Sequence, residues 1–318
     1  MNKFLKKSIA LLLALACALN LAIVSFAAES VISGTCGKDL VWSFDEATGT
    51  LTISGVGAMD DFGDENPIPW ENLQSEIKTV IITDGVTTIG DLAFSNCDNL
   101  TNVEIPDSVE YIGGAIFYLA DYYEDTTNWG DDALYIGKYL IAANSFIIGD
   151  YVIKEGTVCI AEGAFQGCRS LTNITIPDSV NTIGSAAFHF CYELTNISIP
   201  DGVTSIKAGT FTMCKNLESV TIPDSVKSIE PIAFTACDKL NDIYFNGTES
   251  EWESIEISET GNEILNDVMV HYTEEANSSD NENPTLWDKV VDFFEDVANF
   301  FENVFNWLKS LFNRISLN

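Results

Sequence analysis

The side chains of this sequence that could carry out chemistry are eight cysteines, two histidines and 48 carboxylates. The cysteines form no Cys-x-x-Cys pair, the spacing that structural zinc sites favour. The sequence also lacks His-Glu-x-x-His, Gly-x-Ser-x-Gly and phosphate-binding loop motifs. His189 stands between two phenylalanines and His271 alternates along an expected strand, so both fit structural roles. We therefore predict that the protein is not an enzyme and has no catalytic residue, metal or cofactor.

Most of the cysteines share one position of a repeated pattern. They are Cys97, Cys168, Cys191, Cys214 and Cys237. Ala120 fills the same position once, and small apolar thiols suit a buried site, so we expect free thiols inside the molecule. Disulfides between neighbouring coils are the alternative. Cys36 and Cys159 fall outside this column, and Cys159 matches an outward position, so we expect it to be the most reactive or bridging thiol.

The composition excludes other classes of function. The chain has 318 residues, 46% of them hydrophobic, and a formal net charge of −33. This length and apolar fraction suffice for one large domain or two small ones. A nucleic-acid-binding protein needs basic residues to neutralise phosphates, so the acidic balance excludes a nucleic-acid partner.

Residues 1–27 have the features of a secretory signal peptide. Three lysines form a basic region, residues 9–19 form an apolar stretch, and Ser25 and Ala27 supply small residues for cleavage. An uncleaved anchor helix is the alternative, although the stretch is shorter than the roughly 20 residues that a membrane span requires. We expect a secreted, extracellular protein that is associated with the cell surface.

A pattern of 23 residues repeats along the chain and determines the fold that we expect. In the copy from Leu171 to Cys191, Ile174 and Ile176 alternate as in a short strand, which Pro177 ends. The next two copies place apolar residues at Leu194, Ile197, Ile199, Val203, Ile206, Phe211, Leu217, Val220, Ile222, Val226, Ile229 and Phe234. Ordering each backbone costs about 1–2 kcal/mol, more than the apolar burial within one coil returns, so the coils must stack.

The repeat L-x-x-I-x-I-P-x-S-V-x-x-I-G-x-x-A-F-x-x-C resembles the BspA-like leucine-rich repeat family of bacterial cell-surface and secreted proteins. It is most similar to copies from gut Firmicutes, and the resemblance covers residues 34–273. The resemblance implies a mainly β fold, a leucine-rich repeat solenoid of about 23-residue coils. It also implies protein–protein contact or adhesion at the cell surface.

We divide the chain into six parts. They are the signal peptide (1–27), an N-terminal β cap (28–76), the leucine-rich repeat solenoid (77–242, with an irregular longer repeat at 121–156), a C-terminal cap (243–273), a linker (274–284) and an amphipathic α-helix (285–318). Within the N-terminal cap, residues 40–54 predict a β-hairpin that covers the open edge of the first coil. The acidic residues 60–66 lack the spacing of a calcium-binding loop, so we expect a solvated loop there.

The irregular repeat at 121–156 holds many of the aromatic residues. One interpretation is an enlarged coil with its own hairpin, and the other is a binding surface, because solenoid insertions project on one face. Exposed tyrosine and tryptophan are common interface anchors. The candidate partner-binding residues are Tyr122, Tyr123, Trp129 and Tyr139.

The C-terminal segment 285–318 carries an apolar heptad seam with charged residues opposite. It could dock on the last coil, lie on a membrane surface, or self-associate or bind another helical protein. The candidate tether or oligomer residues are Trp287, Phe294, Phe301, Trp307, Leu308 and Phe312.

Together these features predict an exported, non-enzymatic scaffold for protein–protein recognition or adhesion at the bacterial cell surface, tethered or multimerised by its C-terminal helix. The partner is a protein ligand or a surface glycan. The alternative function is a glycan- or cell-wall-binding module, which exposed tyrosine and tryptophan could also serve.

Overall fold

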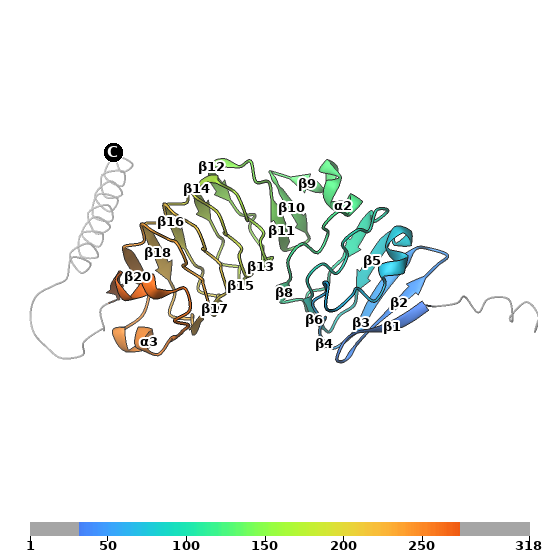
Figure 1. Ribbon diagram of the computed structural model, residues 1–318, viewed down its shortest axis with the longest axis horizontal. Coiled ribbons are helices and arrows are strands. Elements are labelled where there is room, and N and C mark those ends of the chain that lie inside the picture. The colour runs from blue at the N-terminus through green and yellow to red at the C-terminus, as the bar shows by residue number, and fades with distance from the viewer. Residues whose placement is uncertain (1–31, 274–318) are drawn as a thin grey trace, which may run out of the picture. The chain divides into compact units, whose positions relative to one another are not determined.

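A computed structural model describes residues 32–273 of the protein (Figure 1). The predicted signal peptide (1–27), linker (274–284) and C-terminal helix (285–318) lie outside the described residues. The described part is a mainly β solenoid of about eight turns of about 23 residues, with few helices. No helix within it is both long and apolar enough to cross a membrane.

The strands are short because each coil bends at a proline or a turn after a few residues. Strands at the first position of the coils, with the N-terminal hairpin, are β1 (Ile32–Gly37), β2 (Leu40–Asp45), β3 (Thr50–Gly55), β5 (Thr79–Ile82), β7 (Asn102–Glu104), β12 (Ile148–Val152), β14 (Ser170–Thr175), β16 (Asn196–Ser198), β18 (Ser219–Ile222), β20 (Asp242–Phe245) and β22 (Met269–Tyr272). Those at the second position, with the central insertion, are β4 (Gly57–Ala58), β6 (Val86–Ile89), β8 (Tyr111–Ile112), β9 (Trp129–Gly130), β10 (Ala133–Ile136), β11 (Tyr139–Ala143), β13 (Cys159–Ile160), β15 (Thr182–Ile183), β17 (Ser205–Ile206), β19 (Ser228–Ile229) and β21 (Glu256–Ile257). The short helices are η1 (Glu71–Glu76), α2 (Asp121–Glu124), η2 (Thr126–Asn128), α3 (Glu249–Glu253) and η3 (Glu263–Asn266).

Neighbouring coils pair through parallel strands at an offset of one repeat. Ser219 of β18 lies opposite Asp242 of β20, and Ser205 of β17 lies opposite Ser228 of β19. Antiparallel pairing is confined to β1–β2–β3 and β9–β10–β11 among the described strands. Stacking therefore uses the backbone hydrogen bonds that a single coil would leave open, as the repeat predicts.

The core is built from columns of equivalent side chains. Rings of Phe165, Phe188, Phe211 and Phe234 follow one another at centroid separations of 5.3 to 5.7 Å. Next to them, the Sγ atoms of Cys191, Cys214 and Cys237 donate to backbone carbonyls of the preceding coil at 3.1–3.2 Å. All seven described cysteines are buried and free, which confirms the prediction of unpaired thiols in a column. In the Leu171–Cys191 copy, only Ile176 of the predicted inward set is partly exposed.

Each regular coil turns through two residues in the left-handed region, which the sequence pattern did not predict. The two columns are Leu92, Ala115, Gly163, Ala186, Gly209 and Ile232, and Asn96, Leu119, Gly167, Phe190, Met213 and Ala236. Most of these residues are not glycine, and their φ values lie between 51° and 78°. The neighbouring coils hold this costly conformation in place, because the turn backbones bond to one another.

The N-terminal hairpin predicted for residues 40–54 is present as β2 and β3, in which Leu40 lies opposite Gly55. β3 pairs in parallel with β5 of the next coil. At the other end, β20 pairs in parallel with β22, so the ladder extends through residues 243–273. The helix α3 in this region begins with a capping box formed by Thr248 and Glu251.

The prediction that Cys159 points outward and is reactive is wrong. Cys159 lies opposite Thr182, as the repeat alignment requires, but β11 of the insertion covers its other side and Tyr139 pairs with it. Its side chain is 1% exposed, and burial raises the pKa of the Cys159 thiol to about 12. Cys36 is also buried, and its pKa is raised to about 12 by burial and then by the Asp60 carboxylate. Neither thiol is therefore activated.

Candidate ligand groove

The regular stacking breaks once in the described chain, between the coil that ends at Ala120 and the coil of Phe165. The hairpin of β10 and β11 enters there, which confirms an enlarged coil with its own hairpin. β11 pairs in parallel with β13, so the hairpin occupies the place of a regular strand. The N–H of Ala143 donates to the carbonyl of Ala164 at 2.7 Å. In a regular junction, that carbonyl would accept from the turn of the preceding coil.

The aromatic column is interrupted at the same place. Phe94 and Phe117 stack at 6.0 Å, and Phe117 then meets Tyr122 at 5.1 Å instead of another phenylalanine. The second column begins with Tyr151, which packs edge-on against Phe165 at 5.6 Å. The two halves accordingly form two clusters of buried residues that meet around β11 and β13.

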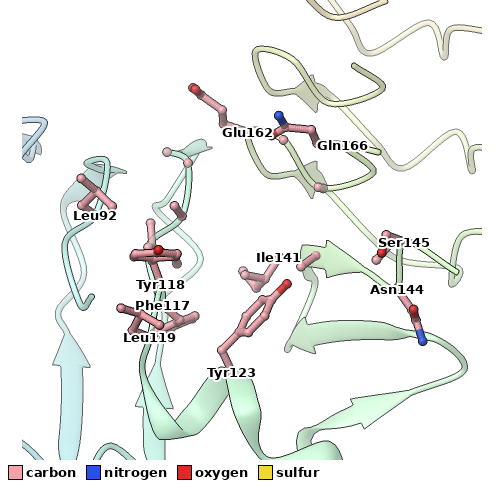
Figure 2. A pocket seen from close by; sticks show the side chains of 18 of the residues that line it. Leu92, Phe117, Tyr118, Leu119, Tyr123, Ile141, Asn144, Ser145, Glu162 and Gln166 are labelled. Carbon is pink, nitrogen blue, oxygen red and sulfur yellow. The ribbon is translucent and has the colours of Figure 1, made fainter. Parts of the chain in front are cut away.

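A groove of about 1230 Å³ opens where the turns of the two halves separate (Figure 2). One wall is the turn of residues 113–119, and the other is the turn of residues 162–166. Ile141 of β11 lies on the floor, with Tyr123 beside it. We define the groove by these two turns, β11 and the adjoining residues 144–146.

The structure places the four predicted partner-binding residues differently. Tyr123 and Trp129 line the groove, and their rings pack edge-to-face at 5.1 Å. Trp129 also donates its indole N–H to the Tyr123 carbonyl at 2.8 Å, which fixes the pair. Tyr122 lies half-buried against Phe117 and closes the first aromatic column.

The prediction that Tyr139 is available to bind a partner is wrong. Its side chain is 1% exposed, and its hydroxyl donates to the carbonyls of Pro106 and Val109 at 2.5 and 3.1 Å. Burial raises the pKa of this phenol to about 12. Tyr139 therefore anchors the insertion to the preceding coil, and a ligand cannot reach its ring.

Sequence reasoning missed the exposed apolar residues of the groove. Tyr118 is 58% exposed, Leu119 is 54% exposed and Phe146 is 84% exposed. Tyr118 and Leu119 occupy repeat positions that are variable in the other copies, so the pattern alone does not mark them. The spacing of 48 residues between Ala120 and Cys168 is the one feature of the sequence that locates the groove.

The groove is acidic. Its charged lining residues are Asp91, Glu124, Asp132 and Glu162, and no lysine, arginine or histidine of the described chain lines it. Glu162 accepts a hydrogen bond from the Tyr111 hydroxyl at 2.6 Å, and Asp91 accepts one from the Gly114 N–H at 2.7 Å.

Burial raises the pKa of two of these carboxyl groups. It raises the pKa of Asp91 and outweighs the lowering effect of the Gly114 N–H, and the nearby Asp61 raises it further. Burial likewise raises the pKa of Glu162 against the lowering effect of the Tyr111 hydrogen bond, and Asp91 adds to the rise. A cation placed between Asp91 and Glu162 would relieve this repulsion.

The other candidate residues serve the fold. His271 lies on β22, where its Nε2 is 2.7 Å from Asp242 and its ring stacks on Tyr244. The His189 ring stacks on Phe190 at 3.8 Å, and burial lowers its pKa. Among residues 32–273, no three His, Cys, Asp or Glu side chains are grouped as metal ligands.

The fold and its groove define a parallel β-solenoid repeat protein with an insertion that opens the stack. Residues 71–147 and 135–258 match the BspA type Leucine rich repeat region in six copies, which is more than half of the chain. The chain belongs to this family of bacterial leucine-rich repeat proteins.

The chain is also similar to several proteins of known structure. A leucine-rich repeat protein from Eubacterium ventriosum is 19% identical, with a TM-score of 0.35 over 80% of this chain and 99% of that one. A leucine rich cell surface protein from Faecalibacterium prausnitzii is 19% identical, with a TM-score of 0.33 over 72% and 99%. The pneumococcal vaccine antigen PcpA is 14% identical, with a TM-score of 0.35 over 78% and 99%. No curated protein matches the chain.

Proposed function

We propose that this protein is an exported, non-enzymatic scaffold that binds a protein ligand in the groove at the break in its repeats. The observation that carries the proposal is the cluster of exposed Tyr118, Leu119 and Phe146 beside an acidic lining. Elsewhere the core positions of the coils are buried, and isolated exposed apolar residues need no explanation. A concave site with aromatic and apolar anchors is where protein interfaces concentrate their binding energy.

Export and surface association rest on the signal-peptide features of residues 1–27 and on the family. One similar protein of known structure is described as a cell surface protein. The excess of carboxylates also suits a secreted protein, because it favours solubility.

Capping of the solenoid is part of the same proposal. The β2–β3 hairpin pairs with β5, and β20 and β22 follow the last regular coil, which supports closure by residues 28–76 and 243–273. Closed ends would keep unpaired strand edges from templating aggregation.

The segment 285–318 is proposed to tether or multimerise the scaffold through its apolar seam. Sedimentation of the secreted protein with and without this segment, with and without anionic lipid vesicles, tests the proposal. Oligomers that need the segment support multimerisation, and pelleting with vesicles supports a membrane tether. A protein that stays monomeric and does not sediment with vesicles would contradict both roles.

Panning of the full chain against a phage-displayed random peptide library tests the proposed binding site. We expect enriched peptides whose binding is weakened at least roughly tenfold by Tyr118→Ala, because truncating an interface anchor costs about 1–2 kcal/mol or more. Tyr244→Ala is the matched control, since Tyr244 is 46% exposed outside the groove. Equal loss in both variants, or no enrichment, would contradict a groove that binds proteins.

The second candidate function is glycan or cell-wall binding, favoured by the edge-to-face pair of Tyr123 and Trp129 at the groove. Aromatic rings commonly stack on sugars, but this pair is fixed by its own hydrogen bond. A glycan array probed with the full chain and with Trp129→Ala decides between the two: glycan binding that Trp129→Ala removes would favour this function over peptide recognition.

A further inference from the structure

The turns of the regular coils form a backbone ladder of their own. Alternate N–H groups of one turn donate to carbonyls of the turn in the next coil. In one junction these are Gly163 to Ser185, Phe165 to Ala187 and Gly167 to His189, at 2.8–2.9 Å. In the next they are Ala186 to Ala208, Phe188 to Thr210 and Phe190 to Thr212, at 2.9–3.0 Å. Each regular turn therefore presents three donors at every second residue.

The groove is where this ladder is open. The N–H groups of Ala115, Phe117 and Leu119 occupy the donor positions, yet they have no acceptor among residues 32–273. On the opposite wall, the Ala164 carbonyl is taken by Ala143, and the carbonyl of Gln166 receives no donor from the described chain. Both walls carry the hydrogen-bonding groups of a regular junction, and the insertion holds them apart (Figure 2).

The fold supplies substitutes for the missing turn at both ends of the ladder. Before the first regular turn, the indole N–H of Trp70 donates to the Ala93 carbonyl at 2.9 Å, and the Gln74 amide donates to the Ser95 carbonyl at 2.7 Å. After the last turn, the N–H of Phe234 donates to the side-chain oxygen of Asn262 at 3.0 Å. These side chains satisfy backbone groups that would otherwise lack partners.

Within the proposed function, we propose that the groove binds a short segment of another protein, which adopts the turn conformation of a regular coil and takes the place of the missing turn. Its carbonyls at alternate residues accept from Ala115, Phe117 and Leu119. An unpaired row of backbone donors beside an apolar wall can bind a peptide by adding it to the ladder, as a strand adds to an exposed sheet edge. Apolar side chains of the segment pack on Tyr118 and Phe146.

The charge of the groove selects among such segments. Asp91 accepts from Gly114 of one wall, and Glu162 of the opposite wall also lies next to Gly114. Each carboxylate already receives one donor from the protein. Acceptor capacity remains on both groups, and no basic side chain of the described chain lines the groove. The segment therefore carries a lysine or arginine near the residue that faces Ala115. The protein's own residues 274–318 hold more carboxylates than basic residues and complement the groove less well.

The chain contains a suitable probe. Residues 207–213 begin with a lysine, and in the fold the carbonyls of Ala208, Thr210 and Thr212 accept from the donors equivalent to those in the groove. A capped synthetic peptide of this sequence is titrated into the isotope-labelled full chain while amide hydrogen exchange is followed by NMR. We expect exchange at Ala115, Phe117 and Leu119 to slow at least roughly tenfold, with unchanged exchange at Ile232 and Phe234.

Two comparisons test charge and apolar contact. A peptide with glutamate in place of its lysine is expected to bind about tenfold more weakly, because a charge-assisted contact is lost. In the protein, Leu119→Ala is expected to weaken binding, whereas Ile232→Ala is not. These two residues are a matched pair, since both are exposed and both have φ near 57°.

Several results would overturn the inference. They are unchanged exchange at the three amides up to the solubility limit of the peptide, equal binding of the glutamate peptide, and protection of the three amides in the peptide-free full chain. The last result would mean that the protein fills its own groove. Library peptides could also bind in a Tyr118-dependent manner while the three amides stay unprotected. The proposed function would then stand, and only the hydrogen bonding of the peptide to Ala115, Phe117 and Leu119 would be contradicted.

Discussion

At the scale of residues, the break in the repeats changes the neighbours of side chains that share a repeat position or a residue type. Phe117 and Phe165 sit at equivalent positions, but each faces a tyrosine across the interruption instead of the other. Tyr139, which its place in the aromatic insertion predicts to be a binding residue, is buried, and its one hydroxyl proton is shared between the carbonyls of Pro106 and Val109. Burial and partner geometry decide these roles, and a linear sequence does not display either.

The cysteine thiols are expected to react slowly in the folded protein. Burial raises the pKa of Cys97, Cys159 and Cys168 to about 12, so the reactive thiolate is scarce at neutral pH. A thiol reagent such as a disulfide dye should label the folded chain slowly and all seven described cysteines after unfolding. Rapid labelling of Cys159 in the folded state would contradict its burial beneath β11.

Glu162 gives the stability a defined pH dependence. Its folded-state pKa is raised, so its contribution to stability is fully present below the ordinary glutamate pKa of about 4.3 and is lost as the pH rises through the folded value. Glu162→Gln removes this contribution while keeping an acceptor for Tyr111. Relative to the variant, the parent protein should gain stability as the pH falls from 7 toward 4.

Denaturant unfolding at a series of pH values measures this difference. Glu193→Gln is the control, because Glu193 is exposed and lies away from the groove. A parent-minus-variant stability that stays flat, or that decreases toward low pH, would contradict the environment described for Glu162.

At the scale of elements, the phenylalanine column carries much of the coil-to-coil packing. Phe188→Ala removes a fully buried ring between two stacked neighbours and is expected to cost about 3–5 kcal/mol. Tyr192→Ala in the same coil removes a partly exposed ring and should cost far less. Thermal and denaturant unfolding of both variants compare the costs, and similar values would mean that the column is not the main contributor.

Sequence reasoning was sufficient for the elements whose environment repeats. Identical neighbours at a fixed spacing placed the strand register and the cysteine column correctly. The hairpin of residues 40–54, which lies outside the repeats, followed from its own strand–turn–strand pattern. It failed where the repeat is interrupted: the burial of Cys159 depends on β11, and the exposure of Leu119 depends on the missing turn beside it. The left-handed turns were also missed, because the conformation of residues such as Phe190 and Met213 depends on packing and backbone bonds between coils, which the sequence does not display.

At the scale of the whole molecule, the described chain contains two clusters of buried residues instead of one continuous core. Repeat proteins are stabilised by contacts between neighbouring coils, so we expect the interrupted junction to couple its two sides more weakly than a regular junction does. The groove and this weak junction have the same origin in the insertion at 121–156.

This arrangement predicts that the halves can unfold separately. Phe211→Ala lies in the second cluster and should produce an unfolding intermediate in which residues 77–120 remain protected from hydrogen exchange. Hydrogen exchange with mass spectrometry in moderate denaturant reports the protection of each half. Simultaneous loss of protection in both halves would show that the junction couples them as tightly as any regular one.

Ligand binding is proposed to occur at the break in the repeats. The most direct measurement places a photo-crosslinking phenylalanine analogue at Tyr118 or, as the control, at Tyr244, and irradiates the full chain with the library-selected peptide. If the ligand binds in the groove, peptide becomes crosslinked from position 118 and little from position 244. Crosslinking from position 244 instead, or equally from both positions, would contradict binding in the groove.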